Sequence, residues 1–137
     1  MAEDNVVIVL KEQLTNEMIE AGAQLTGKLD EMGLPLVAAL WLFSPEINEW
    51  RLVFATPEVS TAGPRTVYAK IRQARQALGQ QNAAIPLFGI DLLDPNDELI
   101  RALRSAMQTG GGISRLRFSK NVAKGHYIED ALIYRVA

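Results

Sequence analysis

The sequence predicts an α+β domain in which a mixed or antiparallel sheet of about five strands carries three helices, packed mainly on one face. Two observations predict this fold. Three segments repeat apolar residues at the spacing of an amphipathic helix, and two pairs of short apolar runs are each joined by a turn-like segment. The elements are expected in the order of an optional strand followed by αββαβαββ. Because hairpins form antiparallel pairs, the sheet is expected to be mixed or antiparallel.

The composition fits one ordinary globular domain spanning residues 1–137. Hydrophobic residues make up 48% of the chain and charged residues 22%. At this length roughly two-thirds of the unfolded surface can be buried, so the core needs no staple. The absence of cysteine excludes a disulfide scaffold, a thiolate zinc site and a cysteine nucleophile. We expect neither a metal nor a cofactor.

The N-terminal sequence favours a cytoplasmic protein with no membrane partner. Its first residues are acidic where a secretion signal would be basic. The longest apolar stretch, Leu34–Phe43, is about half of the roughly 20 residues that cross a bilayer, and it fits a buried strand instead.

The first strongly periodic segment, Asn16–Met32, predicts an amphipathic helix. Thr15 is a suitable N-cap, and Gly33 followed by Pro35 supplies a stop. Before this helix, the β-branched and apolar run Val6–Leu10 suggests a short edge strand.

The next two apolar runs, Leu36–Phe43 and Trp50–Thr56, predict a hairpin because the six residues between them have the composition of a turn. A loop of that length places Phe43 opposite Trp50. Both faces of the hairpin are then apolar, whereas a sheet with one wet face alternates apolar and polar residues. The hairpin is therefore expected to be covered on both sides.

One face of this hairpin is aromatic and suggests an interface. Tryptophan and phenylalanine are common anchors between proteins. If the helices cover the other face, a second copy of the chain is the simplest cover for the aromatic one, which gives a homodimer. The alternative is that helices or the N-terminal segment cover both faces within one chain. The candidate interface residues are Trp41, Phe43, Trp50 and Phe54.

Two further helices and a strand follow. A helix starts at Pro64 and ends at Gly79, and the apolar segment Ile85–Leu93 predicts a strand at an edge, since proline and glycine interrupt it. Asp94 followed by Pro95 predicts the start of the third helix. The carboxylates near that start could also suggest a metal, but capping the helix explains them.

The chain closes with a second predicted hairpin, in which the strands Ile113–Ser119 and His126–Val136 flank a loop at residues 120–125. In the first strand Arg115 and Arg117 share one face. In the second strand Ala131, Ile133 and Arg135 are expected to alternate with Leu132, Tyr134 and Val136, and the acidic pair Glu129–Asp130 could mark a bulge.

The charge distribution points to this last hairpin as a candidate site for an anion or other ligand. The net charge is −2, yet residues 101–137 carry seven basic side chains and two acidic ones. With Lys124 and Arg135 the basic residues could also bind nucleic acid, although a pI of about 5.4 argues against this. The alternative is that acidic side chains face them in the fold. The candidate anion- or ligand-binding residues are Arg115, Arg117, Lys120, His126 and Asp130.

No arrangement in the sequence identifies catalytic residues. His126 is the only histidine, and in a regular strand it shares a face with Asp130 but not with Glu129. The three glycines from Gly110 follow a helix, whereas phosphate-binding loops precede one. We therefore predict a non-catalytic cytoplasmic binding or protein-interaction module that self-associates. The alternative is a small enzyme or nucleic-acid-binding protein that uses the basic C-terminal hairpin.

Overall fold

The structure, a computed structural model, describes residues 10–86 and 88–137 and contains one mixed five-stranded sheet. The strand order is β3-β2-β1-β5-β4, and β2 and β3 run parallel while the other neighbours are antiparallel. The strands are β1 (Ala38–Ser44), β2 (Glu49–Ala55), β3 (Ile90–Leu93), β4 (Leu116–Ala123) and β5 (His126–Val136). The predicted α+β class and mixed sheet are confirmed.

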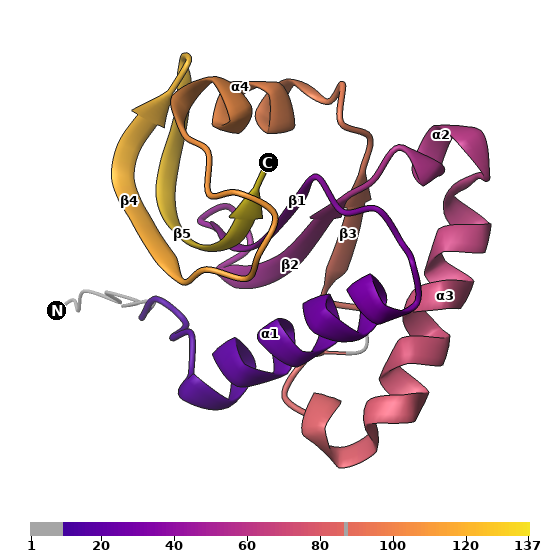
Figure 1. The fold of residues 1–137 in the computed structure, drawn as a ribbon. Helices are drawn as coiled ribbons and strands as arrows, with labels where there is room; N and C mark the ends of the chain where they lie inside the picture. The colour runs from indigo at the N-terminus through magenta and orange to yellow at the C-terminus, as the bar shows by residue number, and fades with distance from the viewer. Residues whose placement is uncertain (1–9, 87) are drawn as a thin grey trace, which may run out of the picture.

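Three longer helices sandwich this sheet, two on one face and one on the other (Figure 1). Between strands the chain also forms one short α-helix and one 3₁₀ helix. No helix within the described ranges combines the length and apolarity needed to cross a bilayer. The helices are α1 (Asn16–Glu31), α2 (Glu58–Thr61), α3 (Pro64–Leu78), η1 (Gly79–Asn82) and α4 (Glu98–Ala106).

The first helix follows its sequence signals closely. The hydroxyl of Thr15 accepts a hydrogen bond from the Met18 amide at 3.1 Å, as an N-cap does. Just after the C-terminal end of α1, Gly33 has a φ of 81°, a left-handed conformation that favours glycine. Of the predicted edge strand Val6–Leu10, only Leu10 lies within the described residues, and it is not in a strand.

The first hairpin has the predicted register. Phe43 pairs with Trp50, and Trp41 pairs with Leu52. Side chains that alternate along β1 and β2 fall into two buried clusters, one beneath α1 and α3 and the other beneath α4. The expectation that both faces of this hairpin are covered is therefore confirmed.

Two predicted boundaries between the second and third long helices are wrong. The strand begins at Ile90 rather than at Ile85, since the Gly89 amide donates to the carbonyl of Pro86 in a turn that precedes it. The last long helix begins at Glu98, and the carboxylate of Asp97 caps it by accepting from the Leu99 amide. Proline and glycine thus shorten the strand, and the cap lies three residues later than predicted.

The last hairpin has a shorter turn than predicted. Only Lys124 and Gly125 separate the strands, and both have positive φ, at 45° and 83°. Two consecutive left-handed residues form the type I′ turn, whose twist matches that of the flanking strands. The segment predicted as a loop therefore continues β4 to Ala123, and Lys120 within it has a φ of 48°.

The register between β1 and β5 shifts by one residue. Ala39 pairs with Arg135, but Leu40 pairs with Ile133, so Tyr134 is an extra residue in β5. This bulge turns Tyr134 and Arg135 to the same face, toward α1, where both form hydrogen bonds. The predicted regular alternation of side chains along β5 therefore fails at Tyr134. The bulge predicted at Glu129–Asp130 lies at Tyr134 instead.

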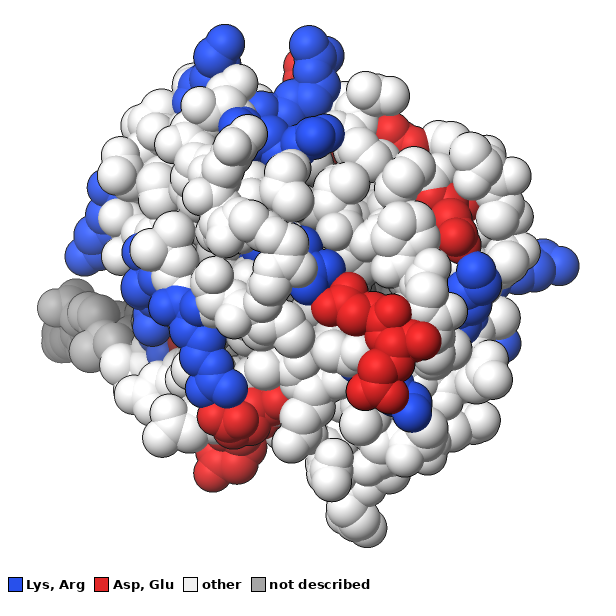
Figure 2. All heavy atoms as spheres, in the orientation of Figure 1, with Lys and Arg blue, Asp and Glu red and all other residues white. Residues whose placement is uncertain are grey.

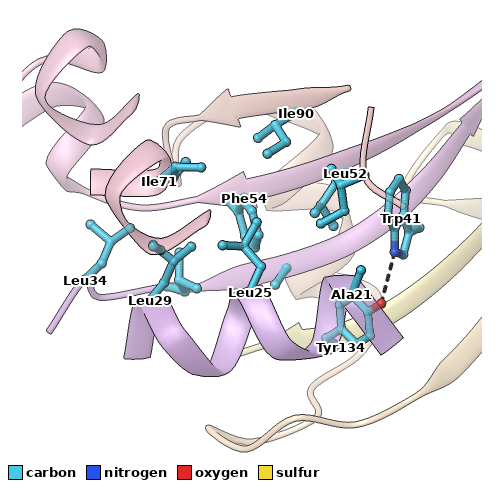
Figure 3. Close-up of a cluster of buried hydrophobic side chains, with 14 of the residues drawn as sticks. Ala21, Leu25, Leu29, Leu34, Trp41, Leu52, Phe54, Ile71, Ile90 and Tyr134 are labelled. Atoms are coloured by element: carbon cyan, nitrogen blue, oxygen red, sulfur yellow. Dashed lines mark hydrogen bonds between the residues drawn. The ribbon is translucent and has the colours of Figure 1, made fainter. Parts of the chain in front are cut away.

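The bulged tyrosine joins α1 to two strands. Its hydroxyl donates to the carbonyl of Ile19 at 2.6 Å. The same hydroxyl accepts from the indole nitrogen of Trp41 at 3.0 Å (Figure 3). The indole nitrogen also lies 3.2 Å from the carbonyl of Met18. Burial raises the pKa of the Tyr134 hydroxyl, which favours its protonated, hydrogen-donating form. At Gly22 the helix approaches these polar groups so closely that no side chain would fit.

We predict that Gly22→Ala destabilises the protein by about 1–3 kcal/mol, because overpacking at a tight contact displaces its neighbours. The new Cβ would lie 2.6 Å from the indole nitrogen of Trp41 and closer still to the hydroxyl of Tyr134. Gly27→Ala in the same helix is the matched control. There the nearest side-chain atom is 3.6 Å away, and alanine should stabilise the helix by roughly 0.5–1 kcal/mol. Urea unfolding measures both, and equal effects would contradict the close contact.

Candidate ligand-binding site

The aromatic residues predicted as an interface are buried inside the chain. Trp41, Phe43, Trp50 and Phe54 are between 0% and 6% exposed and belong to the cluster beneath α1 and α3. The segment before α1 completes the cover, because the indole nitrogen of Trp50 donates to the Glu12 carbonyl and the Lys11 ammonium lies 4.8 Å from the ring centre of Phe43. The prediction that these four side chains form an exposed interface is wrong. The alternative, cover within one chain, is confirmed.

The basic side chains of the C-terminal part face acidic ones from α1. Arg115 binds Glu20 through two hydrogen bonds of 2.6 and 3.0 Å. Arg135, only 4% exposed, forms a similar pair with Asp30. On the face drawn in Figure 2, basic side chains (blue) lie beside acidic ones (red). The charge asymmetry of the sequence is thus partly neutralised between the two parts of the chain.

Arg117 and Asp130 form the centre of a third charged group. Both oxygens of Asp130, which is 5% exposed, accept from the Arg117 guanidinium at 2.6 Å, and Lys11 adds a contact of 2.8 Å. The Arg117 guanidinium holds the pKa of the Asp130 carboxyl below its usual range, and Lys11 adds to this effect. The group ties the segment before α1 to the last hairpin.

The remaining predicted site residues do not join this group. His126 is half-buried at the turn end of β5 and makes no hydrogen bond with Asp130 in the described part of the chain. Lys120 is exposed on the edge strand β4. The predicted anion-binding residues are therefore divided among separate contacts. Within residues 10–86 and 88–137, no three His, Asp or Glu residues lie close enough together to hold a metal ion.

The structure instead places a hollow of about 720 Å³ between α3 and β3, which we call the α3–β3 pocket. This volume is within the usual range for small-molecule sites. Its wall combines guanidinium groups with aromatic and aliphatic side chains. The residues on which the argument depends are Arg51, Tyr68, Arg72, Arg75, Phe88 and Ile90.

Helical spacing and strand pairing build this pocket. Tyr68, Arg72 and Arg75 lie four and three residues apart along α3 and therefore share one face of the helix. The parallel pairing of β2 with β3 brings Arg51 to Asp91, and their side chains form two hydrogen bonds of 2.7 and 3.1 Å. This bidentate pair neutralises the sheet side of the pocket.

The helix side of the pocket keeps its positive charge. Arg75 is half-buried and donates to the side-chain oxygen of Asn82 at 3.0 Å and to the carbonyl of Ile85 at 2.7 Å, both neutral acceptors. Burial lowers the pKa of Arg75, but a guanidinium remains protonated in proteins. Arg72 forms no ion pair with any described residue. Two cations thus face the pocket without a carboxylate partner among residues 10–86 and 88–137.

The rest of the wall suits an apolar group. Tyr68 is partly exposed, Phe88 is 83% exposed, and the buried side chain of Ile90 lies beside them in the wall. An exposed phenylalanine beside guanidinium groups can contact the apolar part of an anionic ligand. The pocket can therefore bind a molecule that combines a negative group with an aromatic or aliphatic body.

Comparison of the chain with protein-family models, with curated proteins and with solved structures finds no match. The chemistry of its own side chains is therefore the basis for assigning a function.

We predict that Asp130→Asn lowers the free energy of unfolding at pH 7 by roughly 2 kcal/mol, since it removes the charge that binds Arg117 and Lys11. The pKa of Asp130 is lowered in the folded state, so its stabilisation is present at neutral pH and lost as the pH falls through that depressed pKa. Urea unfolding at pH 7 and pH 3 measures this. The difference between wild type and variant should shrink at pH 3.

Glu129→Gln is the control for this change. Glu129 is the adjacent, less buried carboxylate, and its contact is a 3.3 Å hydrogen bond from the hydroxyl of Tyr127. We expect a change within about 0.5 kcal/mol. A difference between Asp130→Asn and wild type that is the same at both pH values would contradict the assignment.

Proposed function

We propose that the protein is a binding module and that its α3–β3 pocket holds a small organic anion with an apolar body. The observation that carries this proposal is the pair of guanidinium groups, Arg72 and Arg75, that face the pocket without a carboxylate partner among the described residues. A bound carboxylate or sulfonate would supply the missing charge and accept hydrogen bonds from them.

The composition of the wall supports binding rather than catalysis. Guanidinium, phenol and amide groups hold a ligand, whereas acid–base catalysis needs a group that exchanges protons near neutral pH. The carboxylate that lines this pocket, Asp91, is held in a bidentate pair with Arg51. His126, the one histidine of the sequence, lies on β5, and β2 and β1 separate β5 from β3 in the sheet. The homodimer and the cytoplasmic location stay predictions from the sequence.

The probe for this proposal is 8-anilinonaphthalene-1-sulfonate, an aromatic anion that fluoresces more strongly in an apolar site. We expect Arg72→Gln to weaken its binding about fivefold, which is the upper end for one partly exposed ion pair. Arg65→Gln is the matched control, because Arg65 is exposed on the same helix and does not line the pocket. Added salt should weaken binding to wild type more than binding to Arg72→Gln.

A competition experiment distinguishes binding of the probe in the pocket from its non-specific adsorption to the protein. Benzoate and 4-phenylbutyrate should compete with the probe, and 4-phenylbutanol, which lacks the charge, should compete less well. The proposal fails if Arg72→Gln and Arg65→Gln bind the probe equally, or if the neutral alcohol competes as well as the acid.

A further inference from the structure

A second hollow adjoins the α3–β3 pocket. Its volume is about 810 Å³, and it lies beside the segment before α1 and the turn between β1 and β2. Arg51 and Phe88 line both hollows, so they form the common boundary. The wall of the second hollow also contains two carboxylates, Glu12 and Glu49. The two hollows meet at these shared residues, and we call them together the groove, with guanidinium groups at the α3 end and carboxylates at the other.

Glu12 is fixed in position although its carboxylate has no cationic partner among the described residues. Its amide donates to the side-chain oxygen of Asn48 at 2.9 Å, and its carbonyl accepts from the indole of Trp50 at 2.9 Å. Asn48 has a φ of 51° in the turn and donates in addition to the carbonyl of Leu10 at 2.9 Å. The backbone is thereby held while the side chain stays exposed at the hollow.

In the middle of the groove one cation, Arg51, lies between two carboxylates, which leaves one negative charge in excess. Arg51 binds Asp91 at 2.7 Å and lies 3.4 Å from the carboxylate of Glu49. Among the described residues, the side chains that lack an oppositely charged partner are Arg72 and Arg75 at the α3 end and Glu12 at the other, where Glu49 adds to the negative charge. Exposed Phe88 lies between them.

We propose that this groove binds an extended peptide segment whose carboxylate lies at Arg72 and Arg75 and whose basic side chain lies at Glu12. The proposal rests on the anion-binding function of the α3–β3 pocket and extends it to a peptide ligand. Each hollow has the volume of a small-molecule site, so a ligand that fills both is longer than one small anion. Phe88 would contact the apolar side chains between the two charges, and the charges fix the direction of the segment.

The test uses isothermal titration calorimetry on the full chain with acetylated peptides. Each peptide ends in a free carboxylate and has one lysine two to six residues before it in an alanine–leucine background. A matched series replaces the lysine with norleucine, which keeps its length and removes its charge. We expect one lysine spacing to bind about fivefold more tightly than its norleucine counterpart.

Protein variants locate the two ends of the peptide. Glu12→Gln should abolish the gain from lysine and leave the norleucine peptides unchanged, whereas Arg72→Gln should weaken both series. Glu31→Gln, an exposed carboxylate at the end of α1 that lines neither hollow, should behave as wild type. A third series, amidated at the C-terminus with glutamate as its last residue, shows whether a terminal or a side-chain carboxylate is bound. Binding of either kind with the lysine gain supports the proposal.

The outcomes separate this inference from the function on which it rests. If lysine gives no gain at any spacing, or if Glu12→Gln leaves the gain intact, the peptide inference is overturned. Weakening of both series by Arg72→Gln would then still support the anion site. If no peptide binds but the aromatic sulfonate binds in an Arg72-dependent manner, the ligand is a small anion alone. If neither binds, both proposals fall.

Discussion

The hydroxyl of Tyr134 fixes the position of α1 on the sheet, and the rest of the structure depends on that contact. It requires the extra residue in β5, which turns Tyr134 and Arg135 to the same face. The tyrosine then holds α1 near its start through the Ile19 carbonyl, and the arginine holds it near its end through Asp30. One irregularity in a strand thus supplies two attachments about three helical turns apart.

The same helix supports the candidate site. Asn82 is 3% exposed, and its amide nitrogen lies 3.4 Å from the carbonyl of Ala21 in α1. Its side-chain oxygen accepts from the guanidinium of Arg75. The position of Arg75 in the pocket therefore depends on α1 through Asn82, and hence on the tyrosine that holds this helix on the sheet. Buried polar groups that satisfy one another in this way give a defined arrangement and little freedom to shift.

Sequence patterns predicted the parts of this fold that depend on local spacing. The first helix, its Thr15 cap and the pairing of Phe43 with Trp50 follow from periodicity and loop length. The bulge at Tyr134 does not, because only the pairing with β1 reveals it. The candidate site was missed for a similar reason. Arg115 looked available, but its partner Glu20 comes from a distant position, and Arg117 pairs with Asp130 of the same hairpin. The pocket instead needs the parallel pairing of β2 with β3. The sequence did contain one signal for the pocket, which is the helical spacing that places Tyr68, Arg72 and Arg75 on one face of α3.

The left-handed backbone of Lys120 has a consequence for the open edge of the sheet. Among the described residues β4 is an outermost strand of the sheet, and such strands can recruit further chains into fibrils through unpaired amides and carbonyls. An added strand would have to desolvate the ammonium of Lys120. It would also have to pair with a main chain that departs from extended geometry at that residue. Both requirements oppose growth of the sheet in that direction.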